Sequence, residues 1–131
     1  MRQKVLVIKL GSAVITNANG NINKAVIKKI VTDIGNLHTN YKIVLVSSGA
    51  VSSGKKYLSS YKGTLLQRKV AAAIGNPILI QLYRSYFQKC ELTVAQALCE
   101  RSHFSNRKQF LQLRDTFNTF WSHNVIPVVN E

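Results

Sequence analysis

Residues 42–54 read KIVLVSSGAVSSG, and this stretch decides the fold class of the chain. Its first part, Lys42 to Val46, is short, β-branched and almost entirely apolar, which is typical of a strand covered on both faces of a parallel sheet. Its second part, Ser47 to Gly54, consists almost entirely of small residues, which allow a ligand to approach the backbone and offer hydroxyl groups to it. The pattern favours a binding loop after a buried strand over a glycine-rich turn into a helix.

The segments on either side predict an alternation of strands and helices. Lys4 to Leu10 (KVLVIKL) has the same strand character, and apolar residues recur at helical spacing from Val26 to Leu37 behind a possible N-cap at Asn23. The later predicted elements are a helix from Leu65 to Ile74 with Thr64 as cap and Gly75 as stop, a helix opened by Asn76-Pro77 toward Phe87, a strand from Leu92 to Ala95, a helix carrying Phe110, Leu113, Phe117, Phe120 and Trp121 and ending near Asn124, and a strand from Val125 to Val129. We expect that aromatic stripe to belong to the core, and Pro127 indicates an edge or bent strand. This order predicts an α/β fold with a mostly parallel sheet.

The composition fits one globular domain. The chain has 131 residues, of which 46% are hydrophobic and 18% are charged. No apolar run approaches the ~20 residues that cross a bilayer, and the N-terminus lacks the features of a signal peptide. We therefore predict a cytoplasmic protein without membrane association, in which Cys90 and Cys99 are reduced, mostly buried thiols and no metal is bound by a cysteine cluster.

The charge is unusual, because 18 Lys and Arg stand against five Asp and Glu, for a net charge of +13. Such a field favours anionic partners, including nucleotides, acidic metabolites and nucleic acid. The basic residues are scattered as doublets and are not interleaved with aromatics on one element, which favours a solvated basic surface over a nucleic-acid interface. A basic nucleic-acid-binding module stays as an alternative, and nucleic acid is not the expected partner.

Candidate site residues follow the strands, because ligands of parallel α/β sheets bind beyond the carboxyl ends of the strands. Lys9 and Gly11 surround the end of the first strand, where an ammonium beside unobstructed backbone amides can hold phosphate. Ser48 and its small neighbours follow the second strand. Asn130 and Glu131 follow the last strand, where they could bind a polar ligand or metal or form a solvated terminus.

A P-loop is a competing interpretation of the serine-rich loop. Residues 49–55 (GAVSSGK) satisfy G-x-x-x-x-G-K after a strand. However, Lys56 stands where a serine or threonine hydroxyl would ligate magnesium, and an ammonium cannot do so. We therefore predict that this stretch is not a P-loop.

Taken together, the segments resemble the N-terminal half of the glutamate 5-kinases, of the amino acid kinase family. The resemblance rests on six segments in order and with similar spacing, which are VIKLGSAVIT, IVLVSSGAV, VAAAIGN, LIQLYRSYF, AQALCERSHFSNRKQFLQLRDTF and NVIPVVNE. It implies a three-layer αβα sandwich that is incomplete, with residues 1–131 as the N-terminal, glutamate-binding part and the nucleotide-binding half absent. Ala13 departs from the family pattern, where a second hydroxyl usually stands.

The resemblance also implies a reaction, the ATP-dependent phosphorylation of the side-chain carboxylate of L-glutamate to glutamyl 5-phosphate, the first step of proline biosynthesis. The implied cofactors are ATP and Mg²⁺, with most of their ligands beyond residue 131. The implied catalytic residue is Lys9, and Lys9, Gly11 and Ser12 would hold the phosphates. The implied substrate-binding residues are Ser48, Gly49, Ala50 and Asn130, and no metal ligand is assigned.

The implied partners are L-glutamate and ATP, together with a second copy or a complementing chain. We expect the 131-residue polypeptide alone to show no turnover. A non-catalytic glutamate-binding or interaction half-domain is the alternative to an enzyme.

Overall fold

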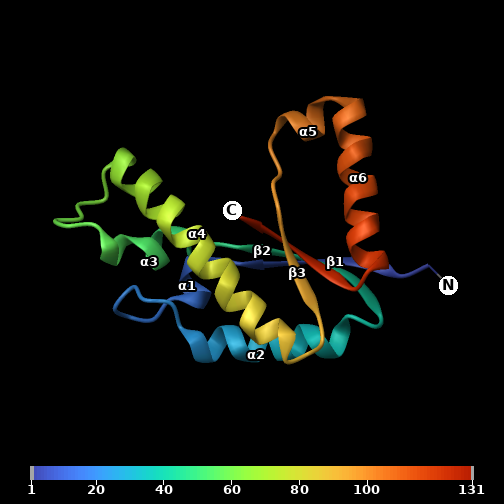
Figure 1. The fold of residues 1–131 in the computed structure, drawn as a ribbon, viewed down its shortest axis with the longest axis horizontal. Coiled ribbons are helices and arrows are strands. Elements are labelled where there is room, and N and C mark those ends of the chain that lie inside the picture. The colour runs from blue at the N-terminus through green and yellow to red at the C-terminus, as the bar shows by residue number, and fades with distance from the viewer. Residues whose placement is uncertain (1, 131) are drawn as a thin grey trace.

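The computed structural model describes residues 2–130 and contains a four-stranded sheet with helices on both faces (Figure 1). In chain order the elements are β1 (Lys4–Leu10), α1 (Ser12–Ile15), α2 (Lys24–Leu37), β2 (Tyr41–Ser47), α3 (Ala50–Gly54), the 3-10 turn η1 (Lys55–Tyr57), α4 (Leu65–Gln88), β3 (Thr93–Ala97), α5 (Ser102–Ser105), α6 (Arg107–Ser122) and β4 (Val125–Asn130). The strand order is β1-β2-β4-β3, and every pair is parallel. The predicted α/β class with a mostly parallel sheet is confirmed.

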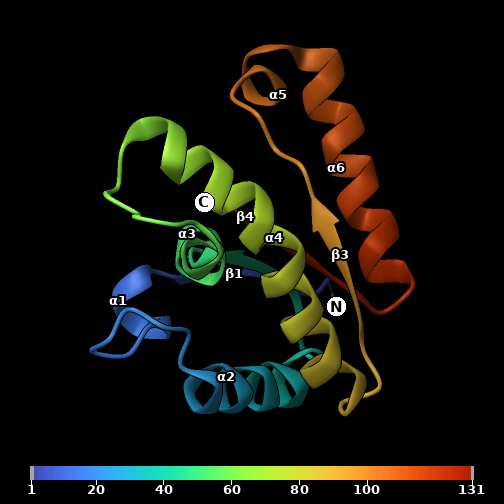
Figure 2. The ribbon, with the colours of Figure 1, turned by 60° about the vertical axis from the view of Figure 1, so that its left-hand side comes forward.

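One face of the sheet carries the core. Residues Leu6, Ile8 and Leu10 of β1 alternate toward this face, where buried Ile43 and Leu45 of β2 join them. Helices α2 and α4 cover it, as Figure 2 shows from the side. The helical side chains that complete this cluster are Ile27, Val31 and Ile34 of α2 and Leu79, Tyr83 and Phe87 of α4.

The start of each long helix is fixed by a side chain that accepts a backbone hydrogen bond. Asn23 accepts from the amide of Val26 at 3.2 Å, which confirms the predicted N-cap of α2. Thr64 accepts from the amide of Gln67 at 3.2 Å, and the Gln67 side chain returns to the Thr64 amide, so that α4 begins with a capping box.

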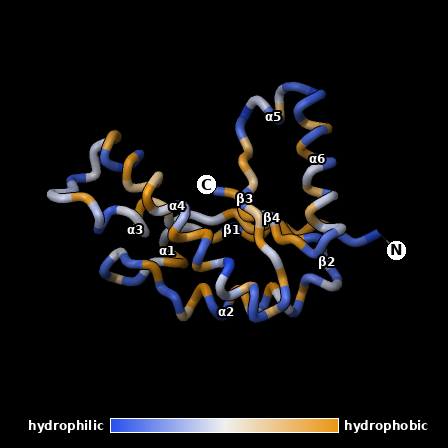
Figure 3. Tube along the Cα trace, in the orientation of Figure 1, coloured by the Kyte–Doolittle hydropathy of each residue, from blue (hydrophilic) through white to orange (hydrophobic). Residues whose placement is uncertain are grey.

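Within residues 2–130, α6 is the long helix on the opposite face, where it forms a third layer (Figure 1). The indole N–H of Trp121 donates to the carbonyl oxygen of Ile43 at 2.9 Å and fixes the base of the helix to β2. No residue of α6 is buried, and Phe110 is 44% exposed. The expectation that the aromatic stripe belongs to the core is therefore wrong; the stripe faces the sheet across an open groove. Figure 3 shows apolar residues along the strands and a mixed pattern along α6.

The predicted break between two helices at Gly75 is wrong, because α4 is one helix that contains both Gly75 and Pro77. Gly75 is required by a helix contact and does not act as a stop, since a Cβ atom there would lie 1.7 Å from the Ala50 carbonyl oxygen. Burial of Leu79, Tyr83 and Phe87 on the sheet holds the helix together beyond the proline.

The last strand, β4, lies inside the sheet between β2 and β3, so of the two predicted alternatives, an edge or a bent strand, the edge is wrong. Pro127 is paired with Ala95 of β3, and the ladder with β2 begins one residue later, at Val128. The proline is thus accommodated where β4 has not yet joined β2. Strand β3 begins and ends slightly later than predicted, at Thr93 and Ala97.

Candidate active site

Three neighbouring strands end at the same level of the sheet. Leu10 of β1 is paired with Ser47 of β2, and Ser47 is paired with Asn130 of β4. The residues that follow these strand ends therefore share one edge of the sheet, which is the ligand-binding edge of parallel α/β folds.

The corner after β1 leaves backbone amides accessible. Gly11 is the N-cap of the short helix α1, with an extended backbone at φ −76° and ψ 165°. A Cβ atom at Gly11 would meet nothing within 4 Å, so the space in front of this backbone is open. The first amides of α1 have no partner within the helix, and unpaired amides at a helix start suit an anionic oxygen.

The corner after β2 is joined to the first corner through the main chain. The Ser48 amide donates to the carbonyl oxygen of Leu10 at 2.9 Å. The Ser47 hydroxyl donates to the carbonyl oxygen of Ser48 at 2.8 Å, and it lies 2.6 Å from the Tyr83 hydroxyl, which then acts as donor to Ser47. Burial raises the pKa of Tyr83, and the hydrogen bond to Ser47 offsets part of that rise. The loop is thus held by a buried, neutral tyrosine.

Gly49 turns the chain from this loop into α3. Its φ of 112° lies in the left-handed region, and a Cβ atom there would lie 2.7 Å from Cδ1 of Ile15. Helix α3 then packs directly on α4 through two glycines, Gly54 and Gly75. A Cβ atom at Gly54 would lie 1.8 Å from the Ala71 carbonyl oxygen, so the two backbones touch without intervening side chains.

A pocket of about 190 Å³ opens between these corners. It is lined by Ser12, Ser48, Gly49, Ala50, Val51, Ser52, Ala72 and Asn130. Five residues that the sequence analysis predicts for the site therefore line one pocket, namely Ser12, Ser48, Gly49, Ala50 and Asn130. Lys9 and Gly11 do not line it. Lys9 is exposed and is paired with Val46, so it lies on the face of the sheet that α6 covers, next to the strand ends.

Five further residues of this region were not singled out as site residues from the sequence. Val51, Ser52 and Ala72 line the pocket from α3 and α4, while Ser47 and Tyr83 support the loop through hydrogen bonds. The sequence pattern placed Ser47 and Ser52 in the predicted binding loop, but it did not show that Ser47 supports the loop whereas Ser52 lines the pocket. Tyr83 stands in an apolar helical stretch that reads as core, and only the structure brings it to Ser47.

The described acidic side chains lie elsewhere. Asp33, Glu91, Glu100 and Asp115 are all absent from the lining of the pocket, and no group of three His, Cys, Asp or Glu among residues 2–130 could hold a metal ion. The described residues therefore do not by themselves fit Mg²⁺, which prefers carboxylate oxygens. Glu131 lies outside the described residues.

The P-loop interpretation fails on geometry. Residues Ala50–Gly54, which would form an open phosphate-binding loop, are helical in α3. Gly54 is buried against Ala71 and is not available to a phosphate. The prediction that this stretch is not a P-loop is confirmed.

The fold is an α/β domain whose candidate ligand pocket lies beyond the carboxyl ends of parallel strands. The family model described as the amino acid kinase family matches residues 4–131. The chain belongs to the amino acid kinase family.

Similar sequences are longer enzymes. The chain is 34% identical to glutamate 5-kinases from Escherichia coli O1:K1 / APEC and from Enterobacter sp. (strain 638), over 98% of this chain and 36% of each relative. It thus spans about a third of the length of the curated relatives that it matches.

Similar solved structures confirm the fold. A UMP kinase from Ureaplasma parvum has a TM-score of 0.61 at 11% identity, over 98% of this chain and 56% of that one. A T. acidophilum isopentenyl phosphate kinase has a TM-score of 0.60 at 12% identity, over 96% and 54%. Among residues 2–130, no helix combines the length and apolarity that a membrane span requires.

Proposed function

We propose that this chain forms the acceptor-substrate part of a glutamate 5-kinase. The reaction is the transfer of the γ-phosphoryl group of ATP to the side-chain carboxylate of L-glutamate, which yields ADP and glutamyl 5-phosphate. The observation that supports this proposal is the pocket at the strand ends, where Ser12, Ser48 and Asn130 converge from three elements. The 34% identity to glutamate 5-kinases supports the choice of substrate.

In this proposal the loop after β2 holds the amino acid. The Ser48 hydroxyl and the Asn130 amide bind polar groups of glutamate, and Gly49 and Ala50 leave the backbone open to it. The hydrogen bonds from Tyr83 to Ser47 and from Ser47 to the Ser48 carbonyl fix the loop before the substrate arrives. Such preorganisation places the carboxylate oxygen for in-line attack on the γ-phosphorus.

The corner after β1 acts on the transferred group. In this proposal the Lys9 ammonium reaches from the α6 face, next to the strand ends, to the negative charge that spreads over the equatorial oxygens of the γ-phosphoryl group. The amides after Gly11 hold the neighbouring phosphate oxygens. Magnesium would neutralise part of the phosphate charge when bound. We assign no magnesium ligand to the described residues and derive no step through the ion.

A chimeric enzyme tests the proposal. Residues 1–131 replace the matching segment of the Escherichia coli glutamate 5-kinase, and hydroxylamine traps the acyl phosphate as a hydroxamate that is measured directly. We expect glutamate-dependent hydroxamate formation, a fall in kcat of about 10²–10³ on Lys9→Ala, and a rise of at least about tenfold in KM for glutamate on Ser48→Ala. Ser59→Ala, in an exposed loop, is the control. A folded chimera that keeps full activity without the Lys9 ammonium contradicts the assigned roles.

Calorimetry on the 131-residue polypeptide gives a second test that does not need the chimera to fold. We expect L-glutamate to bind the wild type, and Ser48→Ala to bind it at least about tenfold more weakly. A coupled assay for ADP release checks the expected lack of turnover by the polypeptide alone. Binding of glutamate without activity in the chimera would instead support a non-catalytic glutamate-binding domain.

A further inference from the structure

A second, smaller cavity lies beside the pocket at the strand ends and shares Asn130 with it. Its volume is about 20 Å³, which leaves room for one water-sized group. The polar residues that line it are Ser47, Asn76, Tyr83, Gln96 and Asn130, and the rest of the lining is apolar. Because three of the five polar residues carry side-chain amides, we call this space the amide cavity.

The register of the sheet brings the lining residues of the strands together. Ser47 is paired with Asn130, and Gln96 is paired with Val128, two residues before Asn130 on the same strand. Since alternate residues of a strand share a face, the side chains of Ser47, Asn130 and Gln96 lie on one face of the sheet. Tyr83 is hydrogen-bonded to Ser47, so this is the face that α4 covers.

The amide cavity continues the pocket in a definite direction. The pocket is lined by residues that follow β1 and β2 and by Asn130 of β4, whereas the cavity is lined from β2, β4 and β3. On α4, Asn76 of the cavity comes one helical turn after Ala72 of the pocket. The two spaces together therefore extend along the edge of the sheet, away from the corner after β1.

This direction fits the length of glutamate. In the proposed reaction the side-chain carboxylate lies beside Ser12 and Ser48, near the phosphate corner, so the other end of the amino acid points toward β4 and β3. The α-nitrogen of an extended glutamate is about 5 Å from its side-chain carboxylate carbon, and neighbouring strands are roughly 4.8 Å apart. The α-amino group therefore reaches one strand further, to the level of Asn130 and the amide cavity.

The cavity offers acceptors for an ammonium group. The Ser47 hydroxyl donates to the Ser48 carbonyl oxygen, so the Tyr83 hydroxyl gives its one proton to Ser47 and keeps lone pairs on its own oxygen. The side-chain amides of Asn76 and Gln96 form no hydrogen bond with another residue of 2–130, and each has a carbonyl oxygen that can accept. Three acceptor oxygens match the three N–H donors of an ammonium group, which is also close to water in size.

We propose that Asn76 and Gln96 determine specificity for an α-amino acid, by accepting hydrogen bonds from the α-ammonium group of the acceptor in the amide cavity. The inference rests on the proposed kinase function and names the part of the substrate that this end of the site recognises. It assigns contacts of this segment alone, so it is tested in the chimeric kinase, where the remaining segments of the enzyme are present.

Glutarate is the matched ligand, because it differs from glutamate only in lacking the α-amino group. The measurements are the KM for glutamate and the inhibition constant of glutarate as a competitor. We expect the wild-type chimera to bind glutamate at least about tenfold more tightly than glutarate, because glutarate leaves the acceptors of the cavity unpaired. Asn76→Leu and Gln96→Met remove the amides at similar size, and each is expected to weaken glutamate about tenfold while leaving glutarate within about twofold.

A change of charge gives the opposite sign. Gln96 is exposed, so Gln96→Glu is expected to fold. Its carboxylate accepts more strongly from an ammonium group, and the α-carboxylate that it repels is present in both ligands. The preference for glutamate over glutarate is therefore expected to rise in Gln96→Glu and to fall in Gln96→Met.

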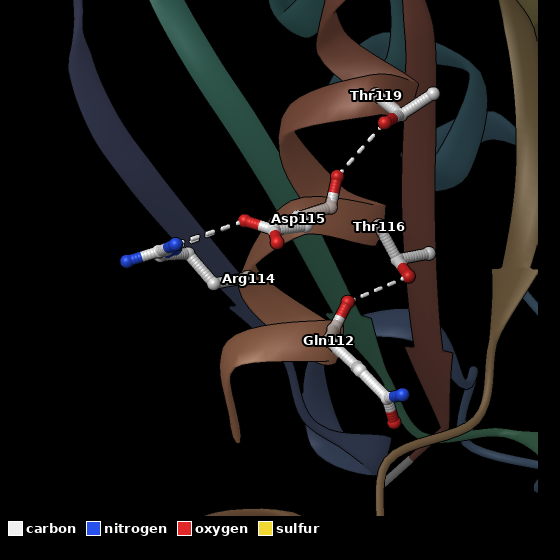
Figure 4. Close-up of polar contacts among 5 residues, drawn as sticks. All are labelled: Gln112, Arg114, Asp115, Thr116 and Thr119. Carbon is white, nitrogen blue, oxygen red and sulfur yellow. Dashed lines mark hydrogen bonds and ion pairs between the residues drawn. The ribbon is translucent and has the colours of Figure 1, made fainter. Parts of the chain in front are cut away.

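Gln112→Met is the matched control for the loss of a glutamine amide. Gln112 lies on α6, outside both the pocket and the cavity, and its carbonyl oxygen accepts from the Thr116 hydroxyl at 2.8 Å (Figure 4). That bond uses the main chain of Gln112, so the substitution keeps it. We expect Gln112→Met to leave the binding of both ligands unchanged.

The outcomes separate this proposal from the proposed function. A folded wild-type chimera that forms no hydroxamate from glutamate contradicts the kinase function, and calorimetry of the 131-residue polypeptide with glutamate and glutarate then decides the specificity. A wild type that binds the two ligands equally overturns the assignment of the cavity. Variants that weaken both ligands equally also overturn it, because Asn76 and Gln96 would then have only a structural role. Should Asn76→Leu fail to fold, the two Gln96 variants give the same decision.

Discussion

The Ser48 amide donates a hydrogen bond of 2.9 Å to the carbonyl oxygen of Leu10, so the loops that follow β1 and β2 are joined to each other. The two loops come from segments almost forty residues apart in the chain, yet they meet one residue beyond the paired strand ends. The bond is between main-chain atoms and involves no atom of the Ser48 side chain, and Ser48 also lines the pocket. The geometry of the pocket therefore follows from the register of the sheet.

Replacing Gly11 by alanine is expected to impair the reaction with ATP without lowering the free energy of unfolding. Its φ of −76° is allowed for alanine, and the added Cβ atom meets no protein atom within 4 Å. The free energy of unfolding in urea should therefore stay the same or rise by about 0.4–1 kcal/mol. In the chimeric kinase the same methyl group would occupy the open space before the loop, and kcat/KM for ATP should fall at least about tenfold. A variant with lowered stability, or with unchanged kinetics, would contradict this assignment.

Tyr83→Phe is expected to lower the free energy of unfolding by about 1 kcal/mol. The variant removes the buried hydroxyl that lies 2.6 Å from the Ser47 hydroxyl and leaves the rest of the ring in place. Tyr86→Phe on the same helix is the matched control, because the Tyr86 hydroxyl has no hydrogen bond in the described part of the chain. Equal urea midpoints for the two variants would show that the Tyr83 hydroxyl does not hold the loop.

The pKa of Tyr83 predicts a loss of stability at alkaline pH. Burial raises the pKa of Tyr83 in the folded state, so the folded protein keeps the phenolic proton after the unfolded chain has begun to lose it. The unfolded state then binds fewer protons, and the free energy of unfolding falls as the pH rises through about 10, the ordinary pKa of tyrosine. The measurement is the difference in the free energy of unfolding between wild type and Tyr83→Phe across this window, so that changes common to both proteins cancel. A difference that does not change with pH would argue against the prediction.

Gly75→Ala is expected to destabilise the fold by about 3 kcal/mol, although alanine normally favours a helix over glycine. The added Cβ atom would lie 1.7 Å from the Ala50 carbonyl oxygen, and α3 would have to move away from α4. Thermal and urea unfolding measure the effect, with Gly11→Ala as the control for a glycine that has room for a methyl group. Similar stabilities for both variants would show that α3 yields easily.

The first two strands and helix α2 were predictable because their sequence patterns are strong and local. Lys4–Leu10 and Lys42–Val46 are continuous apolar strands, and α2 combines a capping side chain with a clear helical period. The errors concern residues whose role is set by distant partners. Gly75 reads as a stop in isolation, whereas its lack of a side chain serves the contact with α3. Pro127 indicates an edge, and nothing in its neighbours in the sequence reveals that β4 joins β2 only after the proline.

The site was predictable to the extent that it lies on loops. The small residues after β2 predicted a binding loop that contains Ser48, Gly49 and Ala50, whereas Asn130 was predicted as a site residue only through the family resemblance. All four line the pocket. Ala72 could not be found in this way, because an alanine in an apolar helix carries no mark of its position against a pocket. The aromatic stripe of α6 reads as core for a related reason, since a helical period shows which side of a helix is apolar and not what covers that side.

Pro77 lies in α4 between Ala72, which lines the pocket, and Tyr83, which is hydrogen-bonded to Ser47. Proline has no amide hydrogen, so the carbonyl of Ala73 receives no bond from that position of the helix. The missing bond therefore lies between the residue of α4 that lines the pocket and the residue that holds the loop after β2.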